Sequence, residues 1–216
     1  MSITINYKNI SNNKNNSNAI LFVDEKFNVL NIKKHISSSE YSFISDLIKT
    51  TDLKKKIVTF DINSKKKILL ISISKKITNS EIENLGAKFY DTLKEFKINE
   101  YQLNSDTAPS NIKNLVGHFL HGLRLKSYNF EKYKTKKSKK NITIFITGKN
   151  KLNFKKQIEF KAVEEGSFYA RDLVSEPGNV LHPDEYAKRI STLKKDGLKV
   201  NIYDEKKLKK LGMHAL

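Results

Sequence analysis

His118 and His121 stand three positions apart, so a helix would place both imidazoles at neighbouring positions, where a metal ion could bind. A zinc site needs at least three protein ligands, but the sequence has no cysteine and no third histidine nearby. The absence of cysteine also excludes disulfides, thiolate metal sites and cysteine nucleophiles. We therefore interpret the two histidines as partly exposed helix residues without a metal role.

Paired acidic residues occur at two further places. Glu164 and Glu165 are adjacent in a predicted helix, where successive side chains face different directions and cannot form a catalytic pair. We expect both on a solvated helix edge. Asp184 and Glu185 fall in the first turn of another predicted helix, where negative charge stabilises the exposed N–H groups.

Other short signals for catalysis or ligand binding do not complete a motif. The segment ITGKN contains the Gly-Lys of a phosphate-binding loop, but Thr143 stands where the first glycine is required and Asn150 follows the lysine. No G-x-S-x-G or G-x-G-x-x-G sequence occurs, so the motifs that would indicate acyl transfer or dinucleotide binding are missing from the sequence. Arg171 and Asp172 precede a Pro-Gly break, and we interpret them as a structural ion pair.

The 216 residues carry a formal net charge of +18, almost entirely from lysine, because only three arginines are present. Specific phosphate and base recognition favours the planar guanidinium of arginine. Lysine, isoleucine and asparagine are all abundant and have A/T-rich codons, so a biased genome explains this composition without a partner. Binding of nucleic acid or another polyanion stays open as an alternative.

Strands and helices alternate along the first 175 residues. Apolar residues recur every second position in the strand candidates and at intervals of three and four in the helix candidates. A polar tract over residues 11–18 indicates a loop. Ser37 and Glu40 have the spacing of a capping box, which marks the start of a helix. A further helix is expected to begin near Ile112, shortly after Pro109. The strand candidates are residues 3–7, AILFV, KKIVTFDI, KILLISIS, EYQL and NITIFIT, and the helices are expected near 40–48, 80–96, 112–123 and 154–174. This order predicts a layered α/β domain with a hairpin in one sheet.

The segment EPGNVLHP indicates a linker, because proline and glycine end the preceding helix. Beyond it we expect a helix from Pro183, a strand LKVNIY and a short helix from Asp204. Residues 179–216 are too few to bury a core of their own. Their apolar side chains should therefore be poorly protected, namely Val200, Ile202, Leu208 and Leu211.

Three segments resemble the leucyl (cytosol) aminopeptidase family. The run ARDLVSEPGNVLHPDEYAKRI is similar to its interdomain segment, with the pattern Arg-x-Leu followed by Pro-x-Asn-x-Leu-x-Pro. LRLKSYNFEKYKTKKS resembles the end of a leucine-rich helix and its basic continuation, and KKLKKLGMHAL resembles a later Gly-Met segment. The matching residues of the first run are Arg171, Leu173, Pro177, Asn179, Leu181 and Pro183.

The resemblance implies a macro-domain-like domain with a mixed sheet flanked by helices over residues 1–152. A connecting helix and linker over 153–178 and the start of an incomplete α/β catalytic domain over 179–216 would follow. Family members hydrolyse N-terminal residues from peptides with two divalent metal ions, Mn or Zn, and assemble as hexamers. The family's metal-ligand and catalytic motifs lie downstream of the Gly-Met segment.

No catalytic, metal-binding or cofactor-binding residue is therefore carried over to this sequence. We expect a chain truncated before those motifs, which serves as scaffold and is inactive alone. No stretch approaches the roughly 18 apolar residues of a membrane span, and the start lacks a signal-peptide run, so we expect a soluble cytoplasmic protein.

Overall fold

A computed structural model describes residues 2–7, 18–136 and 140–213, which fall into two compact units. The first unit spans residues 1–167 and the second spans 168–216, and each is described by itself. The loop predicted over 11–17 and the lysines at 137 and 139 lie outside the described residues, whereas Asn18 begins a strand. Among the described helices, none is both long and apolar enough to cross a membrane.

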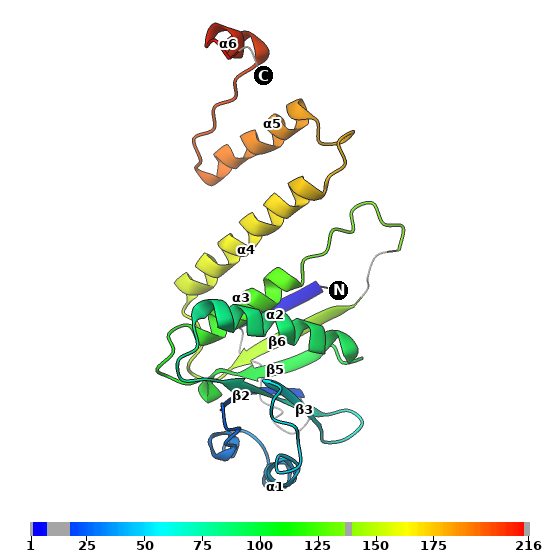
Figure 1. The fold of residues 1–216 in the computed structure, drawn as a ribbon, viewed down its shortest axis with the longest axis vertical. Coiled ribbons are helices and arrows are strands. Elements are labelled where there is room, and N and C mark those ends of the chain that lie inside the picture. The colour runs from blue at the N-terminus through cyan, green and yellow to red at the C-terminus, as the bar shows by residue number, and fades with distance from the viewer. Residues whose placement is uncertain (1, 8–17, 137–139, 214–216) are drawn as a thin grey trace. The chain divides into compact units, whose positions relative to one another are not determined.

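The first unit is built on a six-stranded sheet in the order β1-β6-β5-β2-β4-β3 (Figure 1). Its strands are β1 (Ser2–Asn6), β2 (Asn18–Asp24), β3 (Ile57–Asp61), β4 (Lys67–Ile73), β5 (Glu100–Asn104) and β6 (Asn141–Thr147). Neighbouring strands run parallel except β3 and β4, which form the predicted antiparallel hairpin. The mixed α/β fold is confirmed, and all six strand predictions before residue 150 are correct in position.

Helices cover the two faces of the sheet unequally. The helices of the first unit are η1 (Leu30–Ile32), α1 (Ser38–Leu47), α2 (Asn79–Glu95), η2 (Ser105–Thr107) and α3 (Leu115–Lys126), followed by α4 (Phe154–Ser175). Figure 1 shows α2 and α3 on one side of the sheet and α1 on the other. The larger core cluster lies under α2 and α3, and the smaller one joins α1 and η1 to β2, β3 and β4.

Two glycines let α2 and α3 approach each other closely. A Cβ atom on Gly86 would lie 1.9 Å from the carbonyl oxygen of Phe119, and one on Gly122 would lie 1.9 Å from that of Glu83. No real side chain fits at such distances. The helix pair therefore depends on backbone contact at these two positions, and this contact fixes where α3 presents its histidines.

The helix ends follow local chemistry. Ser37 and Glu40 form the predicted capping box of α1, and Thr78 and Glu81 form a second one, which the sequence analysis did not identify, at the start of α2. The prediction that the third helix opens near Ile112 is wrong. That helix begins at Leu115, because Asn114 adopts a left-handed conformation with φ of 56°.

The second unit contains the end of α4, then α5 (Pro183–Ser191), η3 (Thr192–Asp196) and α6 (Glu205–Lys210). Arg189 donates hydrogen bonds to Glu176 and Glu185 at 2.9 Å each. The strand predicted over LKVNIY is wrong, since residues 198–203 form no strand. A strand needs a partner edge, and within the described residues of this unit no other strand is present.

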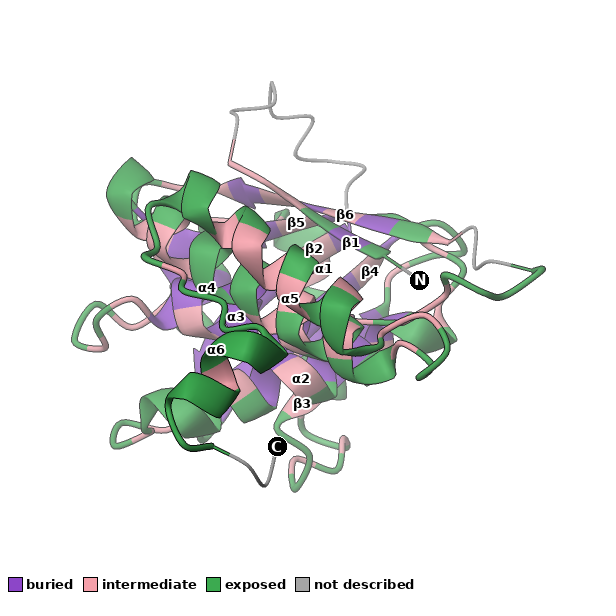
Figure 2. Ribbon diagram, turned by 90° about the horizontal axis from the view of Figure 1, so that it is seen from above, coloured by how far each residue is buried: buried purple, intermediate pink, exposed green. Residues whose placement is uncertain are grey.

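Figure 2 shows that buried residues concentrate in the strands and in α2 and α3, whereas α5 and α6 carry only intermediate and exposed residues. Ile202 is 47% exposed and Leu211 is 58% exposed, while Val200 and Leu208 are half-buried. This exposure agrees with weak protection of the last described residues.

Candidate functional site

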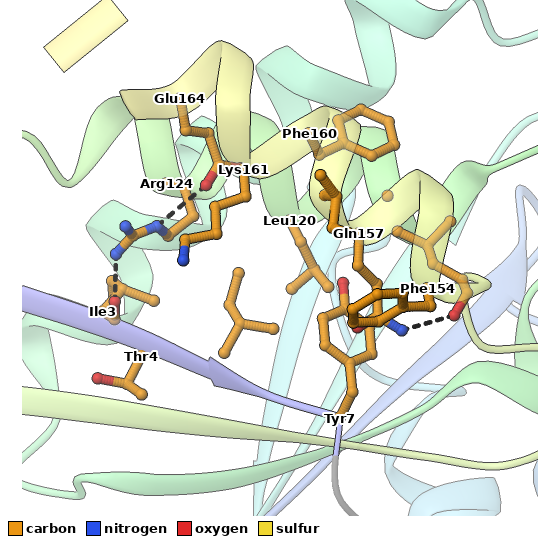
Figure 3. A pocket seen from close by; sticks show the side chains of 14 residues that line it. Ile3, Thr4, Tyr7, Leu120, Arg124, Phe154, Gln157, Phe160, Lys161 and Glu164 are labelled. Atoms are coloured by element: carbon orange, nitrogen blue, oxygen red, sulfur yellow. Dashed lines mark hydrogen bonds and ion pairs between the residues drawn. The ribbon is translucent and has the colours of Figure 1, made fainter. Parts of the chain in front are cut away.

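A cavity of the first unit lies between β1, α3 and the first half of α4, and we call it the α3–α4 cavity (Figure 3). Its volume is about 550 Å³. Apolar walls come from Ile3, Ile5, Leu120, Leu152 and Phe160. Figure 3 shows Arg124, Lys161 and Glu164 toward one end of the cavity and Tyr7, Gln157 and Phe154 toward the other.

Glu164 connects α4 to α3 at the first of these ends. Its Oε1 lies 3.2 Å from His121 Nδ1, and its Oε2 accepts a hydrogen bond of 3.3 Å from Arg124 Nε. Arg124 also donates to the carbonyl oxygen of Ile3, so the same guanidinium reaches β1. Three elements are therefore joined by one polar cluster, formed by Glu164, His121, Arg124 and the Ile3 carbonyl.

The expectation that Glu164 lies on a solvated helix edge is wrong. Its side chain is 9% exposed, and it is the one buried residue of α4. Glu165 does lie on the solvated edge, where its side chain is 64% exposed and 3.5 Å from the ammonium of Lys161. The 100° rotation per helical residue turns one carboxylate toward α3 and the other toward water.

His118 binds a different helix. Its Nδ1 lies 2.7 Å from Glu83 Oε1 of α2, and its ring contacts Phe160 with centroids 5.1 Å apart. The two histidines therefore stand beside each other as predicted, and each is paired with its own carboxylate. The expectation that both are partly exposed is wrong for His121, whose side chain is only 9% exposed because Glu164 and Phe160 of α4 cover it. Within the described residues no group of three or more His, Asp or Glu side chains could hold a metal ion.

The other end of the cavity is held by Tyr7 and Gln157. Burial, together with the negative charge of Glu164, raises the pKa of Tyr7 well above its ordinary value, so the phenol stays protonated. Gln157 donates a hydrogen bond of 2.7 Å to the carbonyl oxygen of Leu152, which ties the start of α4 to the segment before it. These contacts position α4 over β1 and leave a largely apolar hollow between them.

The ITGKN segment folds back on the protein. Gly148 has φ of 94°, and the backbone N–H groups of Lys149 and Asn150 donate to Asp106 at 2.6 and 3.0 Å. A phosphate-binding loop would need those N–H groups for its ligand. The geometry therefore agrees with rejecting that motif.

The remaining predicted residues lie in the second unit or at its start. Asp184 and Glu185 occupy the first turn of α5, as expected, and Glu185 pairs with Arg189. The hydrogen bond from Arg189 Nε lowers the pKa of Glu185. The ion pair suggested for Arg171 and Asp172 stays a prediction.

Sequence reasoning missed two buried ion pairs. The link between α3 and α4 through Glu164 joins residues 40 or more positions apart, and Lys66 binds Glu40 at 2.5 Å with side chains only 7% and 11% exposed. For the pair of Glu164 and Arg124, the sequence offers one signal, namely a charged residue, Arg124, beside the apolar stripe of a helix. For the pair of Lys66 and Glu40, the residues near each of them in the sequence give no signal.

Comparison with known proteins tests the resemblance to the leucyl (cytosol) aminopeptidase family. Residues 168–216, the same residues as the second unit, match the model of the cytosol aminopeptidase family, catalytic domain. A protein of Clostridium perfringens named "Probable cytosol aminopeptidase" is 28% identical over 204 residues, which cover 89% of this chain and 39% of the relative. The chain thus spans about two fifths of the length of that relative.

Solved structures share the fold. A tomato leucine aminopeptidase mutant aligns with a TM-score of 0.70 at 16% identity, over 98% of this chain and 46% of that one. The bottromycin maturation enzyme BotP in complex with Mn aligns with a TM-score of 0.66 at 15% identity, over 92% of this chain and 40% of that one. The sequence match to the Clostridium perfringens protein therefore runs through both units, and residues 168–216 are similar to the catalytic domain of the cytosol aminopeptidase family.

Proposed function

We propose that this chain is the scaffold portion of a leucyl-aminopeptidase-like metallo-exopeptidase that removes N-terminal residues from peptides. The observation that carries the proposal is the similarity over 89% of this chain to 39% of a relative named "Probable cytosol aminopeptidase". A cytoplasmic location, assembly of six copies and the domain limits 1–152, 153–178 and 179–216 belong to the same proposal.

The described residues do not fit the pair of divalent metal ions, Mn or Zn, that the family uses. No described group of three or more His, Asp or Glu side chains comes together, and the carboxylates of Glu83 and Glu164 are paired with imidazoles. We therefore derive no catalytic step from this chain. Its contribution is structural: α4 begins in the first unit, where Glu164 anchors it, and continues into the second.

A chimera tests the scaffold role. Residues 1–216 would replace the matching segment of the Clostridium perfringens relative, and hydrolysis of leucine p-nitroanilide would be measured with Mn²⁺ or Zn²⁺. We expect metal-dependent turnover and a hexamer on size-exclusion chromatography. A matched chimera that lacks residues 1–167 should lose both. A chimera that assembles yet turns over no substrate, or one that works equally well without residues 1–167, would contradict the proposal.

The net charge of +18 favours a second candidate function, binding of nucleic acid or another polyanion. Such binding releases counterions, so it predicts an affinity for DNA or RNA that falls steeply with rising salt. Electrophoretic mobility shifts with the full chain would measure it. If no shift appears even at low salt, this candidate is removed, whereas the aminopeptidase proposal is unaffected.

A further inference from the structure

Two contacts between α3 and α4 frame the α3–α4 cavity. Glu164, the one buried residue of α4, binds His121 and Arg124 of α3. Gly117 of α3 meets the ring of Phe160, where a Cβ atom on the glycine would lie 2.4 Å from a ring carbon. Both contacts are made to α3 and not to the sheet. A hollow of about 550 Å³ therefore stays between α4 and β1.

The size and the lining of the α3–α4 cavity are those of a small-molecule site. Cavities that hold small molecules have volumes of about 300–1,000 Å³, are mainly apolar, and carry a few polar groups that orient the ligand. The α3–α4 cavity lies within this range, with isoleucine, leucine and phenylalanine side chains in its walls. Its polar groups lie toward its two ends (Figure 3), and these ends differ in what they offer a ligand.

The charged end of the cavity is already paired within the protein. Glu164 binds His121 and Arg124. The ammonium of Lys161, the other cation in the lining, lies 3.5 Å from the carboxylate of Glu165. A charged ligand at this end would have to displace one of these partners, and a charge placed against the apolar walls would lose its hydration. The cavity therefore favours a neutral molecule.

The opposite end offers two hydrogen-bonding groups. Tyr7 lines the cavity, and among the described residues its hydroxyl has no hydrogen-bond partner. Burial raises the pKa of Tyr7, so the phenol stays protonated and can both donate and accept. Gln157 donates through Nε2 to the carbonyl oxygen of Leu152, whereas its Oε1 accepts no hydrogen bond from the part of the chain that the structure describes. Figure 3 shows Tyr7 and Gln157 at the same end of the cavity.

The rim of the cavity on α4 is apolar. Phe154 and Ile158 line the cavity, yet they are 75% and 51% exposed. They stand four positions apart, so they lie on the same face of the helix. An apolar molecule in the cavity would cover part of this surface and remove it from water.

We propose that the α3–α4 cavity binds a small neutral molecule with an apolar ring and one hydroxyl group, such as an aromatic or alicyclic alcohol. The ring lies against the apolar walls, and its hydroxyl donates to Gln157 Oε1 and accepts from Tyr7. Because the molecule contacts both β1 and α4, its binding also holds the first half of α4 more firmly. This inference does not depend on the aminopeptidase proposal.

The test is an NMR titration of the ¹⁵N-labelled full chain with three probes that share one ring: p-cresol, toluene and 4-methylbenzoate. We expect saturable amide shifts at Ile5, Leu120 and Gln157 with p-cresol, at a Kd of about 1 mM. Toluene lacks the hydroxyl and should bind about three- to tenfold more weakly. The carboxylate of 4-methylbenzoate should weaken binding roughly tenfold or more, despite the positive net charge of the protein. Amide exchange over residues 155–166 should slow in the presence of p-cresol.

Tyr7→Phe tests the hydrogen bond without changing the shape of the cavity. It should weaken binding of p-cresol about three- to tenfold and leave binding of toluene unchanged, because toluene makes no hydrogen bond to the phenol. A purely structural effect of the substitution would weaken both probes alike.

Two exposed residues of α4 provide a matched pair at the rim. Ile158 lines the cavity, whereas Val163, which is 57% exposed, is not part of the lining. Ile158→Asp should weaken binding of p-cresol roughly tenfold, because a charge replaces apolar surface, and Val163→Asp should leave it unchanged. Spectra of the free variants will show that the fold is intact.

Each of four results would overturn the proposal. The first is the absence of saturable shifts with p-cresol at about 20 mM. The second is an affinity for toluene or 4-methylbenzoate equal to that for p-cresol. The third is equal weakening by Ile158→Asp and Val163→Asp, or by Tyr7→Phe for p-cresol and toluene. The fourth is a set of shifts around Ile158 that depends on protein concentration and not on p-cresol, which would show that a second copy of the chain covers the rim.

Discussion

The substitution Glu164→Gln tests whether a single buried carboxylate holds α4 on the first unit. It removes the charge at nearly constant volume and weakens the contacts to His121 and Arg124. The side chains of Glu164 and His121 are each 9% exposed, whereas that of Arg124 is 27% exposed. Water can therefore replace part of the lost contact to Arg124, but little of the contact to His121.

These exposures set the expected magnitude. Removing one partner of a buried ion pair costs about 3–5 kcal/mol, and a hydrogen bond to a charged group contributes about 1.5–3 kcal/mol. Because glutamine keeps one acceptor oxygen and Arg124 is partly hydrated, we expect a loss of about 2–4 kcal/mol. For a domain of this size that corresponds to a Tm lower by roughly 5–15 °C.

Glu165→Gln is the matched control. Its carboxylate is one residue away and is exposed, and among the described residues it pairs with exposed Lys161, so its loss should cost less than about 0.5 kcal/mol. Urea and thermal unfolding followed by circular dichroism give both values, and amide exchange over residues 155–166 reports whether α4 loosens locally. Equal stability of the two variants would refute the anchoring role of Glu164.

Three further outcomes follow from the packing and the charges. Gly122→Ala should lower the free energy of unfolding in urea by about 1–3 kcal/mol, because α2 leaves no space for a Cβ atom. Gly166→Ala has open space around it, so it should raise the free energy of unfolding by up to about 1 kcal/mol through its higher helix propensity. The reverse order of the two stabilities would contradict the close contact between α2 and α3. The pKa of Glu40 is lowered in the folded state, so its stabilising contribution is present above the ordinary value of 4.5 and is lost as the pH falls through the lowered value. Unfolding free energies between pH 7 and 3 should therefore fall more steeply for the unaltered chain than for Glu40→Gln, and parallel curves would refute this. Amide exchange should be rapid across residues 200–211, since α6 buries no residue; slow exchange in a monomer would contradict this.

Local sequence patterns were sufficient to place most elements. The stripe from Ile82 to Leu93 identified α2, and the capping box at Ser37 identified the start of α1, because both signals depend on neighbouring residues only. The strand predicted over LKVNIY failed for the opposite reason. Its apolar alternation is typical of a strand, but the strand state requires a partner that this unit does not provide among its described residues.

The α3–α4 cavity could not be predicted from the sequence. Ile3, Leu120 and Phe160 line the α3–α4 cavity but come from three distant segments, which meet only in the folded chain. Glu164 was predicted to face the solvent and in fact faces α3. Helix periodicity gives the angles between side chains on one helix, but it does not show which face of the helix packs against another element. The resemblance to the aminopeptidase family, by contrast, could be recognised without a structure, because it lies in the consecutive residues from Ala170 to Ile190.

The central claim is that this chain supplies structure to a peptidase while its reaction centre is formed elsewhere. The most direct measurement is hydrolysis of leucine p-nitroanilide by the purified 216-residue chain with Mn²⁺ or Zn²⁺, together with the metal content of the protein after gel filtration. We predict no turnover above a mock purification and no retained metal. Peptidase activity that co-elutes with the chain and carries two bound metal ions per chain would contradict the claim.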